Sequence, residues 1–266
     1  MIARLRYCAA MSAISAHVPR SRRDRPAKAP LSREAFVHAG LDLLETGGLA
    51  NLSLRKIAAA LDTGSASLYV YVENIHHLHA LMLDTALSEI RYGGQEPAAR
   101  RVKAALDSYL EVMLARRGLA QLAATTMPEG ENWMRLNEFL LAGLLEAGVA
   151  PERAAWGIDL LLLQVTAKAA ELTAWGEQGD VIAHTADTYA KASATSFPHL
   201  HELHDLVFAG TTTRRLAWAL DALLDGIAHT PLPPQPAPPR ATANDQHGIA
   251  RRRACTSELV CDEHVP

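Results

Sequence analysis

Residues 51–81 constrain most strongly how this chain can fold, because two short helical patterns flank a small polar break. Ser53 can cap the first pattern, which places three apolar side chains on one helix face: Ile57, Ala58 and Leu61. The break is Asp62-Thr63-Gly64, and both Asp and Gly tolerate the left-handed backbone that ends a helix tightly. The segment therefore predicts a helix-turn-helix unit, which presents its second helix to the major groove of DNA.

The second short helix carries most of the predicted contacts with DNA. Leu68 and Val72 are four residues apart and are predicted to hold this helix to the core. We predict that Tyr69 of this helix and Arg55 of the preceding one contact phosphates. Such contacts position the helix-turn-helix unit, called the reader below, on the duplex. The side chains expected to face bases or sugars are Ser65, Ser67, Val70 and Tyr71, and the predicted surface also includes Ser53, Ala66 and His76.

One further helix, upstream of the helix-turn-helix unit, completes a small three-helix domain over residues 31–75, and a connecting helix follows it. Residues 31–48 have the apolar spacing of a helix that Ser32 can cap and that two glycines end. Asn74 is the candidate N-cap of the next helix, which is predicted to run to about residue 91. Convincing strand alternation is found nowhere in the sequence. The predicted fold class is all-α, with an N-terminal three-helix helix-turn-helix domain and a larger helical ligand-binding and dimerisation domain.

The N-terminal segment resembles the DNA-binding domain of TetR-type (TetR/AcrR) transcriptional regulators. The matching residues are the run LSLRKIA at 52–58, Ser67-Leu68-Tyr69 and Tyr71-Val72, and the resemblance covers about residues 32–87. It implies a homodimeric repressor that a small molecule releases from a palindromic operator. The chain departs from the family at Ile75, where the family usually has a Lys that contacts a phosphate. Either His76 or His77 is predicted to replace that contact in part.

Residues 76–230 are predicted to form the regulatory and dimerisation domain. After the connecting helix, a helix is expected over about residues 97–116, followed by a shorter one that ends at 126. The remaining expected helices span about 132–147, 151–175, 181–194, 199–209 and 211–229. Residues 1–30 are expected to form a basic disordered arm. Residues 231–266 begin with a Pro-rich run and are expected to form a disordered tail, since proline cannot continue a helix.

Two helices are predicted to hold the dimer together. The segment from Trp156 to Leu172 is apolar almost all round, which is typical of a helix buried on several sides. The last helix has an apolar seam of Leu216, Leu220, Leu223 and Ile227. We predict that these two helices pair with those of a second copy, and a monomeric core is the alternative. A DNA-binding domain this small gains affinity when a dimer places two copies of it on the two halves of a two-fold operator.

A ligand pocket is predicted in the larger domain. Its expected apolar walls are Met113, Trp133, Met134, Phe139, Trp156 and Trp175. Its expected polar groups, which would orient a ligand, are Asn137, Gln164, Thr166 and Glu171. Ordinary core packing is the alternative for each of these positions.

The net charge of the chain is −3, but it is divided unevenly. Residues 1–75 hold ten Lys and Arg against six Asp and Glu, a net charge of +4, whereas the rest carries −7. A basic N-terminal part suits binding to a polyanion. The basic cluster at residues 20–28 is interpreted either as a flexible arm on DNA or as a solvated tail.

The sequence predicts a cytoplasmic protein. It has no run of about 18 uncharged apolar residues and no convincing signal-peptide pattern. Its cysteines, Cys8, Cys255 and Cys261, all lie outside the predicted domains, which favours a reducing compartment over a disulfide-stabilised fold.

Two other functions compete with the regulator. A helical metal-dependent enzyme would need His and carboxylate ligands that converge in the core, and His76, His77 and His79 are the histidines that suggest it. A chromosome-coating protein would bind DNA without sequence preference or response to a ligand. No phosphate-binding loop, nucleophile elbow or paired-carboxylate pattern is found, so we expect no enzymatic activity, no metal and no cofactor.

Overall fold

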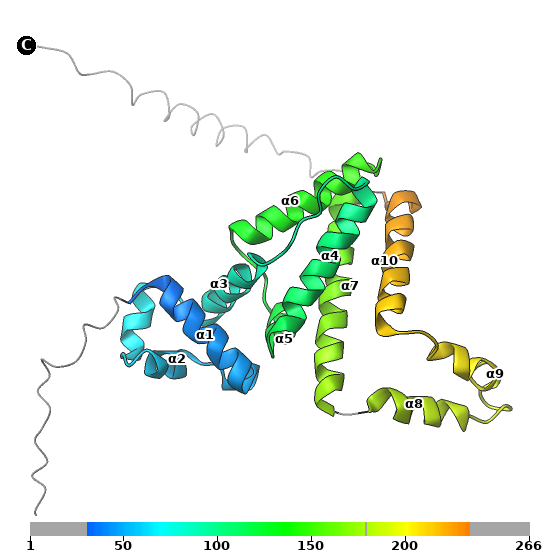
Figure 1. Ribbon diagram of the computed structural model, residues 1–266, viewed down its shortest axis with the longest axis horizontal. Coiled ribbons are helices and arrows are strands. Elements are labelled where there is room, and N and C mark those ends of the chain that lie inside the picture. The colour runs from blue at the N-terminus through cyan, green and yellow to red at the C-terminus, as the bar shows by residue number, and fades with distance from the viewer. Residues whose placement is uncertain (1–30, 179, 235–266) are drawn as a thin grey trace, which may run out of the picture.

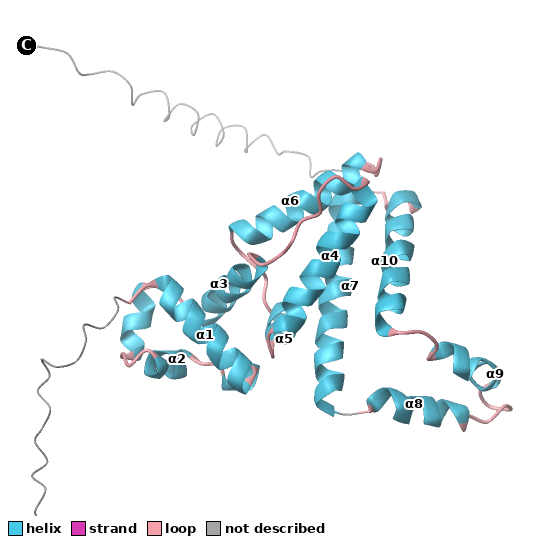
Figure 2. Ribbon diagram, viewed as in Figure 1, coloured by secondary structure: helices cyan, strands magenta, loops and turns pink. Residues whose placement is uncertain are grey.

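The computed structural model describes residues 31–178 and 180–234, and all regular elements in these ranges are helical (Figure 1, Figure 2). The all-α prediction is therefore confirmed for the described part of the chain. The described part excludes the basic segment of residues 1–30, most of the Pro-rich tail and the three cysteines. The elements are α1 (Arg33–Gly47), η2 (Leu49–Asn51), α2 (Leu54–Ala60), η3 (Ser65–Val70), α3 (Ile75–Leu87), α4 (Ala98–Ala115), α5 (Leu119–Thr125), α6 (Glu131–Glu146), α7 (Pro151–Gln178), α8 (Val181–Ala190), α9 (Pro198–Val207) and α10 (Thr212–His229).

The first three α-helices and η3 pack around one small apolar core. Fully buried side chains come from all four elements, namely Phe36, Ile57, Leu68 and Leu78. Three N-caps predicted from the sequence form as hydrogen bonds from backbone N–H groups: Ala35 to Ser32 Oγ, Lys56 to Ser53 Oγ and His77 to Asn74 Oδ1. Each cap satisfies an amide that the first turn of a helix leaves without a partner.

The larger domain is a bundle built on α7. This helix contacts α4, α5, α6 and α10, and Ala154, Leu161 and Val165 are fully buried among them. The prediction of a helix buried on several sides holds for only part of the circumference, because Leu163 remains 62% exposed. Within the described ranges, no helix combines the length and apolar character needed to cross a lipid bilayer.

Helix α3 joins the two parts of the molecule. It packs against α1 on the N-terminal side and against α5 and α6 of the bundle (Figure 1). Its C-terminal end falls at Leu87, four residues before the predicted end. Helix α3 therefore contacts both the small N-terminal domain and the bundle directly.

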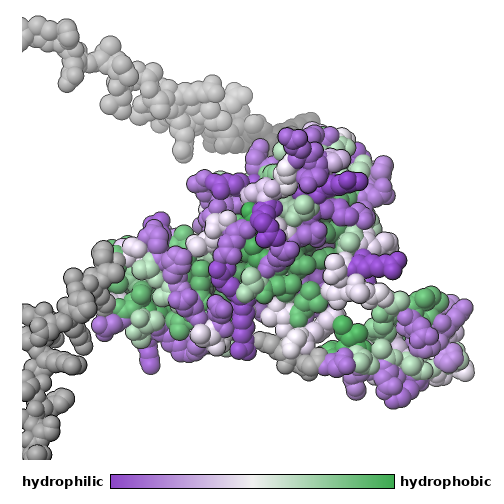
Figure 3. Space-filling view, in the orientation of Figure 1, coloured by the Kyte–Doolittle hydropathy of each residue, from purple (hydrophilic) through white to green (hydrophobic). Residues whose placement is uncertain are grey.

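Helices α8 and α9 form an arm that projects from the bundle (Figure 1). They pack mainly on each other, and the rings of Tyr189 and Phe208 lie 5.2 Å apart between centroids. Neither helix contains a buried residue, and several apolar side chains such as Leu206 are exposed. Figure 3 shows these apolar residues mixed with polar ones on the visible face of the arm.

Most of the predicted dimer seam of α10 faces the interior of the subunit, whereas Leu223 is half-buried and lines a groove between α7 and α10. Leu216, Leu220 and Ile227 are buried in the same apolar core as Leu161 of α7. The expectation that these side chains meet a second copy is therefore wrong. An amphipathic helix buries its apolar stripe on the nearest apolar surface, and here α7 of the same subunit supplies that surface.

Candidate DNA-binding surface and ligand cavity

The break between α2 and η3 is a tight left-handed turn. Asp62 has a φ of 48°, and the N–H of Thr63 donates to the Ala58 carbonyl at 2.9 Å, which closes the last turn of α2. Gly64 has a φ of −79°, so the left-handed position falls on Asp62 and not on the glycine. Asp is one of the few non-glycine residues that adopt this conformation routinely.

Element η3 presents two large side chains to solvent. Tyr69 is 61% exposed and Val70 is 80% exposed, whereas Leu68 anchors the element in the core. Ala66 is exposed and Ser67 is half-buried. The element is a 3-10 helix, tighter than the α-helix that the sequence pattern suggests. These four predicted DNA-binding residues are therefore accessible, while their contacts with DNA stay a prediction.

The neighbouring predicted residues on α2 are also accessible. Arg55 is exposed, and Lys56 beside it donates to the side chain of Asn51. Ser53 uses its oxygen as the N-cap of α2, which leaves the hydroxyl proton available to a phosphate. The side chain of Ser65 lies outside the described residues.

Tyr71 serves the core of the small domain and not its surface. Its hydroxyl donates to the Leu31 carbonyl at 2.9 Å, and its ring lies 5.2 Å from that of Phe36. The prediction that Tyr71 faces bases or sugars does not fit this placement. The sequence pattern placed it outside because it falls between two apolar positions of a helix, but the chain has left the helix at this residue.

The first turn of α3 carries one exposed histidine, His76. Ile75 is half-buried and cannot supply the charge that the family usually has there, whereas His76 is exposed. The rings of His76 and His79 lie 6.2 Å apart. Partial burial lowers the pKa of His79, and the nearby His76 lowers this pKa further. We therefore regard His76 as the better phosphate-binding candidate.

A cavity of about 600 Å³ is lined by α4, α5, α6, α7 and the loop that joins α5 to α6. Three of the predicted ligand-binding residues line it: Trp133 and Asn137 on α6 and Thr166 on α7. Asn137 donates to the Trp133 carbonyl at 2.8 Å, so one hydrogen of its amide is used while its oxygen is open to an occupant. The cavity has the size and mixed lining of a small-molecule site.

A pair of hydroxyl groups forms a polar point on the cavity wall. The hydroxyl oxygens of Tyr109 and Thr166 lie 2.7 Å apart and share a hydrogen bond. Burial raises the pKa of Tyr109, while the bond from Thr166 lowers it to a smaller extent, so the phenol stays protonated. The pair thus offers both a proton and acceptor lone pairs to a ligand.

The other seven predicted ligand-binding residues lie away from this cavity. Met113 is fully buried in the core, and Met134 is 63% exposed on α6. Phe139 packs on the ring of Tyr92, with 4.8 Å between centroids. The remaining four lie on other parts of α7: Trp156, Gln164, Glu171 and Trp175.

Two of these residues surround a lysine near the C-terminal end of α7. Lys168 pairs with Glu171, and its Nζ lies 5.3 Å from the centroid of the Trp175 ring. These contacts explain Glu171 and Trp175 without a ligand. The prediction that they belong to one pocket with Trp133 is therefore wrong.

Several residues that line the cavity were not predicted from the sequence. Tyr109, Met127, Asp159 and Leu163 are the largest or most polar of them. A signal existed for Tyr109, because a tyrosine within the apolar stripe of a helix usually places its hydroxyl near a partner. No signal existed for Met127, which lies in an irregular loop.

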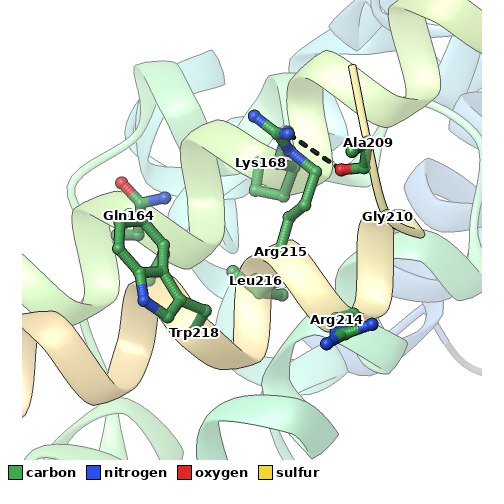
Figure 4. A pocket seen from close by; sticks show the side chains of 9 residues that line it. Gln164, Lys168, Ala209, Gly210, Arg214, Arg215, Leu216 and Trp218 are labelled. Atoms are coloured by element: carbon green, nitrogen blue, oxygen red, sulfur yellow. Dashed lines mark hydrogen bonds between the residues drawn. The ribbon is translucent and has the colours of Figure 1, made fainter. Parts of the chain in front are cut away.

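A second cavity, of about 580 Å³, lies in the groove between α7 and α10 (Figure 4). Gln164 and Lys168 line it from α7, and Trp218 from α10. Arg215 donates to the Ala209 carbonyl at 3.1 Å, which ties the start of α10 to the end of the arm. The prediction assigned Gln164 to the ligand pocket, but the structure places it in this outer groove.

The same groove continues toward the other end of α7. There it encloses about 400 Å³ between Trp156, Leu160, Ala222 and Gly226. Trp156 is 52% exposed and Trp218, further along the groove, is 73% exposed. The α7–α10 face of the subunit therefore carries two large aromatic side chains that the subunit itself does not cover.

Metal ligands do not gather in the described part of the chain. Within residues 31–178 and 180–234, no three His, Cys, Asp or Glu side chains are grouped to hold a metal ion. The histidines of α3 approach one another, but no carboxylate completes a ligand set with them there.

Comparisons with known proteins fit this arrangement. Residues 94–230 match the family described as "Tetracyclin repressor-like, C-terminal domain". An HTH-type transcriptional regulator of Saccharopolyspora erythraea is 31% identical over 120 residues, which are 44% of this chain and 51% of the relative. The repressor DrrR1 of Streptomyces coeruleorubidus is 41% identical over 63 residues, which are 23% of each chain. The chain thus spans about half the length of the first of these curated relatives and less of the second.

Among solved structures, ActR of Streptomyces coelicolor is similar over nearly its whole length. The two proteins are 34% identical, the match covers 75% of this chain and 98% of ActR, and the TM-score is 0.69. ActR structures also exist in complex with actinorhodin and with (S)-DNPA. Fold and sequence together define a helical regulator with an N-terminal helix-turn-helix domain. The chain belongs to the TetR family of transcriptional regulators.

Proposed function

We propose that this protein is a homodimeric transcriptional repressor that a small molecule releases from its DNA operator. One observation carries the proposal: the subunit has both an exposed η3 element and a separate cavity of about 600 Å³. Helix α3 connects them, because it follows η3 in the chain and packs on α5 and α6, which line the cavity. The dimer would have one conformation whose two η3 elements fit the operator and another in which they do not. A ligand with higher affinity for the second conformation would shift the population toward it and release the DNA.

The reader surface is proposed to bind one major groove per subunit. Arg55, Tyr69 and His76 are accessible for phosphate contacts, and Val70 is exposed enough to touch a thymine methyl. Two readers on one two-fold dimer would meet successive half-sites of a palindromic operator.

The dimer is proposed to form through the outer face of α7 and α10. Its exposed apolar residues are Trp156, Leu160 and Trp218. Arg214 lies near the start of α10 and Asp225 near its end, so an antiparallel pairing of two α10 helices would bring opposite charges together. This face replaces the seam predicted from the sequence.

The ligand is proposed to be a flat aromatic compound with hydroxyl or carbonyl groups. The cavity supplies the Trp133 side chain for stacking, and it supplies the Tyr109–Thr166 hydroxyl pair and Asn137 for hydrogen bonds. The actinorhodin complex of ActR supports this class and provides the first compound to test.

Two experiments test the proposed function directly. Sequences bound by the purified protein are selected from a random DNA pool, and actinorhodin is then titrated into the complex with the selected duplex. We expect a palindromic site and release of the DNA. Binding of all sequences with equal affinity and no release would instead support a chromosome-coating protein.

Two tyrosines in the reader provide a matched pair of variants. Tyr69→Phe should weaken binding to every sequence by about fivefold, because one hydroxyl contact with a phosphate is lost while the fold is unchanged. Tyr71→Phe should instead lower the free energy of unfolding by about 1 kcal/mol, because the hydroxyl of Tyr71 donates to the Leu31 carbonyl inside the domain. Its operator affinity should stay nearly unchanged. Fluorescence anisotropy and circular dichroism measure the two effects, and the reverse outcome would show that the docking is wrong.

Two amides on different cavities separate the ligand site from the outer groove. Asn137→Ala should lower the affinity for actinorhodin about tenfold, because the ligand loses a hydrogen-bond partner in an apolar site. Gln164→Ala should leave that affinity unchanged, since Gln164 lines the groove between α7 and α10. Quenching of tryptophan fluorescence measures the affinity, and light scattering checks that both variants keep their oligomeric state. An equal loss in the two variants would contradict the assignment of the cavity.

A further inference from the structure

The first turn of α6 is capped by a side chain from another helix. Gly130, its N-cap residue, makes no side-chain hydrogen bond. Asp84 of α3 takes that role: its Oδ1 accepts the backbone N–H of Trp133 at 2.9 Å, and its Oδ2 accepts Asn132 Nδ2 at 3.1 Å. The same Asn132 amide also reaches the Asp84 carbonyl oxygen at 3.1 Å. The carboxylate additionally faces the positive end of the dipole of a 16-residue helix.

The backbone at Gly130 is shaped for this contact. Gly130 has a φ of 135°, a conformation that L side chains rarely adopt, and a Cβ there would lie 2.3 Å from Cγ of Asp84. Any side chain at position 130 would thus displace the carboxylate. The close approach of α3 to the start of α6 therefore depends on a glycine at this position.

The two helices that Asp84 joins have different tasks. Helix α3 starts at the Asn74 cap directly after the reader and packs on α1. Helix α6 carries Trp133 and Asn137 into the cavity wall, and the N–H that Asp84 accepts belongs to Trp133 itself. A single residue of α6 thus contacts both the cavity and, through its backbone, the helix that carries the reader.

We propose that Asp84 is the positioning residue through which the cavity and the DNA reader are coupled. This inference rests on the proposed function. Apolar contacts between α3 and the bundle tolerate sliding, whereas a hydrogen bond to a helix cap fixes direction. An occupant that shifts Trp133 changes the direction of its N–H, and α3 must follow or lose the bond. Because coupling between two sites is reciprocal, DNA bound at the reader must in turn stabilise the first turn of α6.

The test uses this reciprocal effect and needs no effector. Hydrogen exchange of the first turn of α6 is measured by mass spectrometry in the full chain, with and without the selected operator duplex. In the wild-type protein we expect the duplex to slow exchange there by about tenfold, which is the order of magnitude that one helix cap contributes. In Asp84→Ala, exchange should be faster and the duplex should not change it.

Two further variants serve as controls. Asp84→Asn keeps an acceptor oxygen without the charge, so it should show a reduced effect of the duplex, and it carries the test if Asp84→Ala does not fold. Asp180 caps α8, because its Oδ1 accepts the N–H of Ala183. Asp180→Ala removes that cap, and in this variant the duplex should still slow exchange in the first turn of α6 as much as in the wild type. Equal slowing in folded Asp84 variants and in the wild type would overturn the coupling. Failure of the wild type to bind any duplex would refute the DNA-reading function itself, and the coupling with it.

Discussion

Leu220→Glu is expected to unfold the subunit. Leu220 is fully buried between α10 and the rest of the bundle. Removing a buried leucine side chain costs about 2–5 kcal/mol, and a carboxyl group left there without a partner adds to that cost. The sum approaches the whole stability of an ordinary domain, about 5–15 kcal/mol. Thermal unfolding followed by circular dichroism should show a large fall in Tm or no cooperative transition.

Leu206→Glu is the matched control for this change. Leu206 is 68% exposed on α9, so the same substitution there should change stability by less than about 0.5 kcal/mol. A folded Leu220→Glu protein that has merely become monomeric would restore the seam predicted from the sequence. It would also show that Leu220 does not pack in the core of its own subunit.

Trp218→Glu is expected to leave each subunit folded and to split the dimer. Trp218 is 73% exposed in the subunit and, with Trp156 and Leu160, forms the α7–α10 face proposed to meet a second copy. A carboxylate buried there without a partner opposes association. Operator affinity should fall by about 100-fold or more, because two linked readers bind far more tightly than one. Light scattering measures the mass and anisotropy measures the affinity.

The control for the dimer is Met134→Glu. Met134 is 63% exposed on α6 and does not line the α7–α10 groove, so its substitution should affect neither mass nor operator affinity. A Trp218→Glu protein that stays dimeric at micromolar concentration would exclude this face as the interface.

Local structure in the helix-turn-helix domain follows from signals in the sequence. Ser32, Ser53 and Asn74 were identified as caps, and each one forms, because a cap depends on residues within one turn of it. Leu68 and Val72 were identified as anchors of the short reader element, and both are buried. The all-helical fold followed from the same local signals, since apolar periodicity reports the type of element directly.

What covers each helix face depends on how distant helices pack. The spacing of Leu216, Leu220 and Ile227 showed that they share one side of α10, but it could not show whether α7 of the same subunit or a second copy lies against that side. The cavity posed the same problem: it combines Tyr109 of α4 with Thr166 of α7, residues 57 positions apart. Asp84 carries no local signal at all, because its partners begin 48 residues away. Periodicity along one helix fixes which side chains point the same way, whereas the partner they meet depends on how distant helices pack.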